Sequence, residues 1–351
     1  METALDTLLA CSIMVIVTLA AMSGTATTIQ PYQLDSSKPY EAKFKAELAE
    51  QILLDSGQPS NWGIETDSQV IRFGLALENS HLPYELDMEK IARLDQNNNH
   101  HVDLKTITSS LAPESRILGI SLKPLFEIDA SLISQTLNGE EKEYTFHVDV
   151  MKSGLPVSAS LRSYTVLNDY LIISEAHNIS NSIDFSVRLP NSLNGTALLI
   201  IFARAEPNVT SFTVLTFKHN MMNEPQRNGT FLKMSLENHV LNVESFDSSI
   251  GVDRVRIFTL NYFFNLTRIS NREETEFNVP NISNSGPMIL VASGSNGSLQ
   301  FNEWTSQPLL PLNFGLSSSE SGSTNTMSYR FIVSIDSTLY ECHITLGDVD
   351  A

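Results

Sequence analysis

The chain has 351 residues, of which 42% are hydrophobic and 18% charged, and its formal net charge is −18. This length suits two or three domains with their own cores, which argues against a single small module. The negative charge repels phosphate backbones, so nucleic acid is not an expected partner. Abundant Ser, Thr and Asn with few charged residues is typical of an extracellular, β-rich protein.

Residues 1–30 are predicted to form a transmembrane helix. No charged residue lies between Asp6 and Asp35, and residues 8–29 would span a bilayer core as a helix of about 20 residues. A signal peptide is the alternative, because the apolar run over 8–22 is followed by small residues that could be cut after Ala26. This alternative lacks the basic residues that normally precede the apolar run.

The orientation of this segment does not follow from its charges. The first basic residue is Lys38, which gives the positive-inside rule the wrong sign for an exported head. Either the head is cytoplasmic or the true start lies upstream of Met1. We prefer the second explanation, because the later half contains seven N-glycosylation sequons where chance at this composition gives about five. Their asparagines are Asn178, Asn194, Asn208, Asn228, Asn265, Asn281 and Asn296.

Two regions follow the apolar segment before the strands begin. Residues 31–57 are predicted to be an amphipathic stem helix, with Ser37 as N-cap and an end at Gly57. Residues 58–138 are predicted to consist of loops and short helices, with helix starts at Asp87 and Asp103.

The hydrophobic period changes to two at Glu143, where alternate apolar residues share one face of a half-buried strand. These residues are Tyr144, Phe146, Val148 and Val150. Further strands at hairpin spacing predict a β-sandwich over 139–222 and a second β-rich domain over 223–351. The predicted fold class is therefore α+β, with an N-terminal helix, a short-helix region and two mainly antiparallel β domains.

One segment has the spacing of a calcium-binding loop. Asp95, Asn97 and Asn99 fall at the first, third and fifth positions of such a loop, and Asp103 lies where a further ligand would come. His100 replaces the glycine of the sharp turn, and Thr106 replaces the bidentate glutamate. A solvated loop between two helices is the preferred interpretation.

Other candidate sites have weaker support. His100, His101 and Asp103 lack a third nitrogen or sulfur ligand nearby, while Trp62 and Trp304 could stack on sugars or pin their loops to the core. No nucleophile-elbow, P-loop or dinucleotide motif occurs, so neither catalysis nor a cofactor is predicted. A glycosidase carboxylate pair stays open, because it needs only spatial proximity.

The segments "QILLDSGQPSNWG", "FGLALEN" and "LDMEKIARL", after the apolar helix, resemble archaeal type IV pilin-like surface proteins. Separately, "VDVMKSGLPVSASLRSYTV" resembles the opening strands of immunoglobulin-like surface domains. The first resemblance implies a membrane-held subunit whose helix stays anchored or packs into a filament core. It also implies an acidic residue five positions into the mature helix, which is Asp6 when counted from Glu2. No basic leader precedes that position in this sequence.

The sequence therefore predicts a single-pass, membrane-anchored, pilin-like protein with most of the chain extracellular. Its expected role is structural or adhesive, or filament assembly, without catalysis. Its expected partners are the membrane, other pilin-like subunits and surface glycans. The alternative is a secreted or anchored glycan-active hydrolase or carbohydrate-binding envelope protein.

Overall fold

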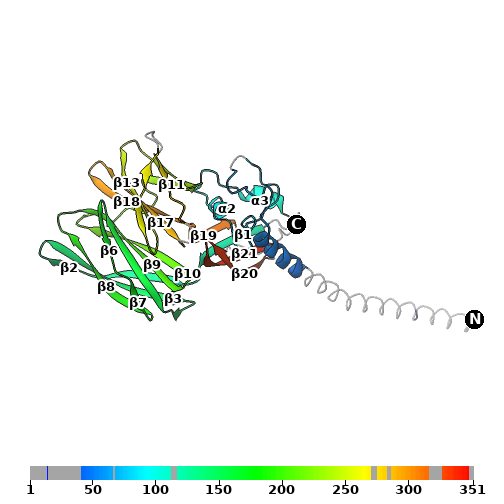
Figure 1. Ribbon diagram of the computed structural model, residues 1–351, viewed down its shortest axis with the longest axis horizontal. Coiled ribbons are helices and arrows are strands. Elements are labelled where there is room, and N and C mark those ends of the chain that lie inside the picture. Colours follow the sequence, from blue (N-terminus) through cyan, green and yellow to red (C-terminus); the bar gives the residue numbers. More distant parts are fainter. Residues whose placement is uncertain are drawn as a thin grey trace, which may run out of the picture. The chain divides into compact units, whose positions relative to one another are not determined.

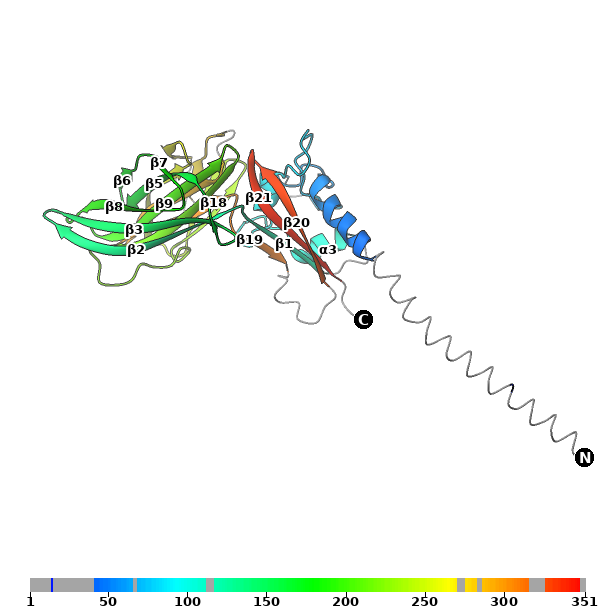
Figure 2. The same cartoon turned by 90° about the horizontal axis from the view of Figure 1, so that it is seen from below.

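The computed structural model describes residues 14, 41–65, 68–111, 117–269, 275–282, 286–315 and 326–347. The chain forms two compact units, residues 1–50 and 51–351. Strands account for 56% and helices for 10%, and the sheets are mostly antiparallel, which confirms the predicted β-rich architecture. Figures 1 and 2 show the strands from two directions.

Helices are few and short in the described chain. Residues 41–54 are helical, within the predicted stem of 31–57. The other two helices are α2 (Met88–Ala92) and α3 (Leu104–Ser110), which begin after the predicted caps Asp87 and Asp103. None of the helices in the described ranges has the length and apolar character needed to cross a bilayer. The expected transmembrane segment, apart from Met14, and the assembly candidate Asp6 lie outside those ranges.

Within the described ranges, the strands form five sheets of four or five strands each. The base sheet contains β1 (Ile117–Pro124), β19 (Leu312–Gly315), β20 (Thr326–Ile335) and β21 (Thr338–Gly347). Sheet I contains β2 (Glu127–Asn138), β3 (Glu141–Lys152), β4 (Leu155–Pro156) and β8 (Ser182–Pro190). Sheet II contains β5 (Ala159–Leu167), β6 (Tyr170–Ile173), β7 (His177–Ile179), β9 (Gly195–Glu206) and β10 (Val209–His219).

The two remaining sheets come from later in the chain. Sheet III contains β13 (Ile250–Phe258), β14 (Phe263–Asn265), β17 (Met288–Asn296) and β18 (Leu299–Gln307). Sheet IV contains β11 (Leu232–Glu237), β12 (Val240–Ser245), β15 (Thr267–Arg268) and β16 (Thr275–Asn278).

Strand β3 has the alternation that the sequence predicted. Its four alternate apolar residues are fully buried and belong to the core between sheets I and II: Tyr144, Phe146, Val148 and Val150. Successive side chains of a strand point to opposite faces, so the intervening polar residues remain on the outer face of sheet I. One face of this sheet is therefore in the core and the other faces solvent.

Strand β9 is buried on both faces. Leu199 and Ile201 contribute to the core between sheets I and II, whereas Leu198 and Ile200 contribute to a second core shared with sheet III. A continuous apolar run is the pattern expected of a strand that has other elements packed against both sides. Sheet II is therefore an inner layer.

Strand β17 of sheet III is also buried on both faces. Leu290 and Ala292 belong to the core between sheets III and IV, and Ile289 and Val291 belong to the core between sheets II and III. The four sheets are thus stacked in the order I, II, III, IV, as two sandwiches that share a third core between them.

The base sheet joins strands from distant parts of the chain. Strand β1 pairs with β19, where Leu122 lies opposite Leu312, and with β21, where Ile120 lies opposite Ile344. All four stacked sheets come from the chain between β1 and β19. Strands β1 and β2 thus occupy part of 58–138, where loops and short helices were expected. That expectation was wrong there because β1 obtains its partners from the other end of the chain.

Candidate functional site

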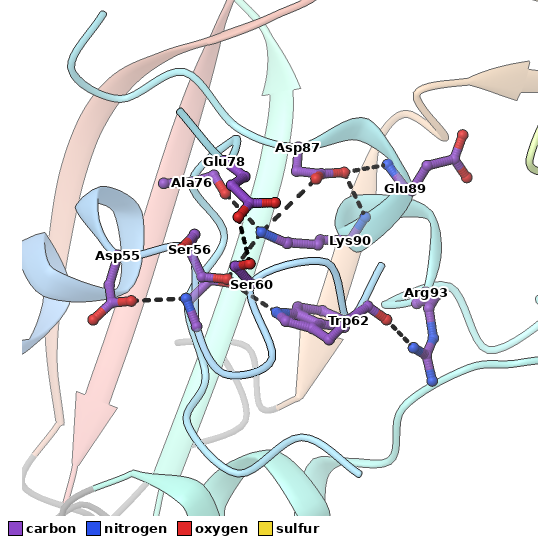
Figure 3. A network of polar contacts seen from close by, with 12 residues as sticks. Asp55, Ser56, Ser60, Trp62, Ala76, Glu78, Asp87, Glu89, Lys90 and Arg93 are labelled. Atoms are coloured by element: carbon purple, nitrogen blue, oxygen red, sulfur yellow. Dashed lines mark hydrogen bonds and ion pairs between the residues drawn. The ribbon is translucent and has the colours of Figure 1, made fainter. Parts of the chain in front are cut away.

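A buried lysine fixes α2 against two loops that precede it. The Nζ of Lys90 donates to the carbonyl oxygens of Ser56 (2.9 Å) and Ala76 (2.7 Å), and lies 3.8 Å from Asp87 Oδ2 (Figure 3). Asp87 in turn caps α2 by accepting hydrogen bonds from the backbone N–H groups of Glu89 and Lys90. Burial lowers the pKa of Lys90, and the nearby Asp87 carboxylate opposes this shift. The segment before α2 is therefore held by the ammonium group of Lys90, whose side chain is completely buried.

Trp62 and Arg93 hold the loop that follows α2. Trp62 is fully buried and donates from its indole N–H to the Gly74 carbonyl (3.0 Å). The Arg93 guanidinium lies over the Trp62 ring, 5.6 Å from its centroid, and donates from Nε to the His100 carbonyl (2.8 Å). The sequence left two roles open for Trp62, stacking on a sugar or pinning its loop to the core. Its buried position supports the second role, because a buried ring is inaccessible to a sugar.

The calcium-loop candidates have protein partners. Asn97 donates from its backbone N–H to Asp95 Oδ1 (3.0 Å), and Asp103 caps α3 by accepting from the N–H of Thr106 (2.6 Å). The amide oxygen of Asn99 accepts from the Lys233 ammonium (2.6 Å), which places a cation from β11 beside the loop. Among the described residues, no group of three His, Cys, Asp or Glu side chains is arranged to hold a metal ion. The solvated loop therefore stays the preferred interpretation, with calcium binding as the weaker hypothesis.

A cavity of about 480 Å³ opens where this loop meets sheets III and IV. Its polar lining comes from Asp95, Asn97, Asn228 and Lys233, and aromatic residues Phe246 and Trp304 contribute to its wall. The remaining lining residues are the apolar Leu232, Met234, Leu309 and Leu310, together with Gly229 and Thr305. This mixture of a few polar groups with apolar and aromatic side chains is typical of small-molecule sites. We treat the cavity as the candidate functional site.

A buried carboxylate holds the segment from which Asn228, Gly229 and Leu232 line this cavity. Glu303 of β18 accepts hydrogen bonds from the backbone N–H groups of Thr230 (2.8 Å), Phe231 (2.7 Å) and Leu232 (2.9 Å). Burial raises the pKa of Glu303, while these N–H groups act to lower it. Asn228 adds a second link, because its amide donates to the Trp304 carbonyl and accepts from the Trp304 N–H, both at 2.7 Å. The residues that enter β11 are therefore fixed to β18.

The chemistry of the lining differs from that of a glycosidase. Among the described lining residues Asp95 is the carboxylate, whereas the oxygens of Glu303 are bonded to backbone amides and Glu303 is not part of the lining. Glycoside hydrolysis normally uses two carboxyl groups on either side of the scissile bond. The described lining of the cavity has polar groups that can bind a polar molecule, but it does not have two carboxyl groups.

Acidic residues surround the contact between α2 and sheet IV. Burial raises the pKa of Glu89 to about 7, the backbone of Asn238 opposes the shift, and the charges of Asp87 and Glu237 add to it. Glu237 also lies 3.3 Å from His100, measured from Oε2 to Nε2. This contact therefore contains a carboxyl group that titrates near neutral pH.

The sequon asparagines lie where a glycan could be attached. Six of the seven are exposed and Asn296 is half-buried. The two fully buried asparagines in the described chain, Asn98 and Asn302, are not part of sequons. Asn228 differs from the others because its amide is bonded on both sides to the Trp304 backbone.

Sequence reasoning named Trp304, Asp95 and Asn97 separately and did not bring them together. The structure places all three around one cavity. Lys233 and Phe246 also line this cavity, and sequence reasoning missed both residues. No local signal identifies these two residues, since their position depends on the pairing of β11 with β12 and on the packing of sheet IV against sheet III. None of the protein-family models compared with the chain matches it, and no match was found among curated proteins.

Proposed function

We propose that this chain is a membrane-anchored, pilin-like cell-surface protein with a structural or adhesive role and no catalytic step. The N-terminal apolar helix holds it in the membrane with Asp6 as an assembly residue, and the immunoglobulin-like sheets form an extracellular head. The accessibility of the sequon asparagines carries this proposal, because an exported domain receives N-glycans only at exposed amides. The strongly negative charge and the abundance of uncharged polar residues also suit an exported surface.

Protease treatment of intact cells, followed by N-terminal sequencing of the native protein, tests this proposal. We expect fragments of the head to be released from intact cells while residues 1–30 stay with the membrane. Cleavage of the head only after cell lysis would contradict the extracellular location. A native N-terminus immediately after Ala26 would contradict the anchor.

Mass spectrometry of the sequon peptides provides an independent test. We expect glycans at one or more of the exposed sequons and none at Asn228, whose amide nitrogen is bonded to the Trp304 carbonyl. Asn228 serves as the internal control, because it is exposed and has the same sequence motif. Complete absence of glycans from protein made in its native host would contradict this part of the proposal.

Carbohydrate binding is a second candidate function, favoured by the cavity that Asp95, Asn97 and Trp304 line. A neutral oligosaccharide titrated into the protein should change the tryptophan fluorescence. Phe246 is 62% exposed at the cavity, and Tyr262 is a comparable exposed aromatic at 57% elsewhere. We expect Phe246→Ala to weaken binding and Tyr262→Ala to leave it unchanged. Equal effects of both variants would contradict a site at this cavity.

A further inference from the structure

The base sheet has a polar groove on one of its faces. Its strands lie side by side in the order β19, β1, β21, β20 (Figure 2). Leu118, Ile120 and Leu122 of β1 are buried, so the alternate residues of that strand lie on the opposite face. A groove of about 270 Å³ lies there. Its polar lining residues come from all four strands: Ser121, Lys123, Asn313, Ser328, His343 and Thr345.

Two glycines leave the space for this groove. Gly119 of β1 lies directly opposite Gly315 of β19, and both line the groove. Directly opposite residues of an antiparallel pair share one face, so this pair leaves one place on the sheet without side chains. Gly315 has φ +71°, and a Cβ there would lie 2.1 Å from the Leu118 carbonyl oxygen. The hollow is therefore built into the backbone, because no larger residue fits at Gly315 without moving the chain.

The charge of the groove is opposite to that of the chain. Acidic residues outnumber Lys and Arg by 40 to 22 in the sequence, yet the described lining contains Lys123 and His343 and no acidic residue. Three hydroxyl groups and the Asn313 amide add further hydrogen-bond donors. An ammonium group with several neutral donors is a set that suits the oxygens of an anion.

A carboxylate beside the groove positions its basic groups. Glu341 Oε1 lies 3.1 Å from Lys123 Nζ and 2.6 Å from His343 Nε2, and Oε2 pairs with Arg330. Burial acts to raise the pKa of Glu341, but hydrogen bonds from His343 and Lys123 outweigh it and hold the pKa at about 2. Glu341 is therefore charged at neutral pH. Even with His343 uncharged, Lys123 and Arg330 bring two positive charges to one negative charge, which leaves one positive charge in excess.

We propose that this groove binds a small oxyanion, the phosphate or carboxylate group of a small molecule, with Lys123 supplying the charge and the hydroxyl groups supplying further hydrogen bonds. The groove is slightly smaller than the sites of drug-sized ligands, which begin at about 300 Å³. The net charge of −18 repels a long polyanion along its whole length. A small anion is affected mainly by nearby charges, since salt screens interactions beyond about 8 Å. The proposal does not depend on the membrane location.

Equilibrium dialysis of the full chain in detergent, at physiological ionic strength, tests the site. The probes are radiolabelled inorganic phosphate and radiolabelled acetate, which distinguish the two sources of the oxyanion. We expect one of them to bind at one ion per chain, and Ser328→Asp to abolish binding, because a carboxylate then lies in the groove. Ser131→Asp is the matched control, since it changes the net charge equally at an exposed position on β2 and should bind like wild type.

A second pair of variants tests the role of the lysine. Lys123 and Lys218 have similar side-chain exposures, 44% and 43%, and each is paired with a glutamate. We expect Lys123→Gln to weaken binding by about tenfold or more, because a charged hydrogen bond is lost, and Lys218→Gln to leave binding unchanged. Circular dichroism confirms that each variant is folded. Ser328 is exposed, so Ser328→Asp keeps the test decisive if Lys123→Gln does not fold.

Three results would overturn the proposal. The first is that wild type binds neither phosphate nor acetate. The second is that Ser328→Asp binds as wild type does, and the third is that the control variants lose binding as much as the groove variants. These outcomes are separate from those of the protease test, which concerns location in the cell.

Discussion

Lys90 and Glu303 are buried charges whose partners are mostly main-chain groups. The Lys90 ammonium binds two carbonyl oxygens, and the Glu303 carboxylate accepts from three N–H groups. In both cases a single side chain satisfies backbone groups in irregular segments or, for Leu232, at the first residue of a strand. Because a buried polar group without a partner is costly, each of these side chains fixes the course of a loop.

Replacement of Lys90 by methionine should destabilise the protein by about 3–5 kcal/mol, because the carbonyls of Ser56 and Ala76 and the Asp87 carboxylate lose their partner. Lys105→Met is the matched control, since Lys105 is exposed on α3 and a change of about 0.5 kcal/mol or less is expected. Urea unfolding of both variants measures the difference. Equal stability of the two variants would show that the Lys90 contacts contribute nothing.

Glu89 should make the protein less stable as the pH rises. Its pKa is raised to about 7 in the folded protein, from 4.5, so between these values the folded state holds a proton that the unfolded state releases. The contribution of Glu89 to stability is therefore full below pH 4.5 and is lost as the pH rises through 7. We therefore expect Glu89→Gln to be more stable relative to wild type at pH 8 than it is at pH 5. Glu206→Gln, at an exposed position, should show no such pH-dependent gain.

At the scale of the elements, polar side chains connect sheets II and III across their shared apolar core. Arg256 of β13 donates to the carbonyls of Asn168 and Asp169 in the turn between β5 and β6, both at 3.0 Å. The hydroxyl of Tyr164 donates in the opposite direction, to the Thr259 carbonyl (3.0 Å). These bonds have fixed directions, so they determine how the two sheets are aligned, which apolar contacts alone leave free.

Arg256→Ala should cost about 3–5 kcal/mol of stability, because the carbonyls of Asn168 and Asp169 lose their hydrogen-bond donor and removal of the buried Arg256 side chain leaves a cavity. Arg254 provides the matched control on the same strand. Its side chain is 42% exposed and forms an ion pair with Asp169 (3.2 Å), so Arg254→Ala should cost no more than about 1 kcal/mol. Thermal and urea unfolding measure both, and a larger loss in Arg254→Ala would contradict this account.

At the scale of the whole molecule, the stacked sheets are an insertion in the base sheet. Strand β1 ends at Pro124 and β19 begins at Leu312, and these neighbouring strands bring the two ends of the insertion close together. Among the described residues, those that form the three cores between the stacked sheets all lie within 125–311. This arrangement is the one in which an inserted domain can fold without the rest of the chain.

A fragment of residues 125–311 should therefore fold alone. We expect the circular dichroism spectrum of a β protein and one cooperative unfolding transition. A fragment of residues 51–124 should remain unfolded, because β1 then lacks both β19 and β21. If residues 125–311 were unfolded and aggregated, the base sheet would be required for the stability of the insertion.

The sequence by itself determined the local features. The alternation in β3 located a strand and its buried face, and the carboxylates of Asp87 and Asp103 located two helix starts. These features depend on residues that are near one another in the chain, so their period or cap can be read directly. The antiparallel β character followed from the same patterns.

The contacts between distant parts of the chain were decided only by the tertiary structure. Pairing of β1 with β21, the burial of β9 on two faces and the meeting of Asp95 with Trp304 at one cavity all join segments that are distant in sequence. Apolar residues show that a strand is buried but not what covers it, because hydrophobic burial has no direction. The partner of each strand is instead set by which sheets can stack and close their hydrogen bonds together.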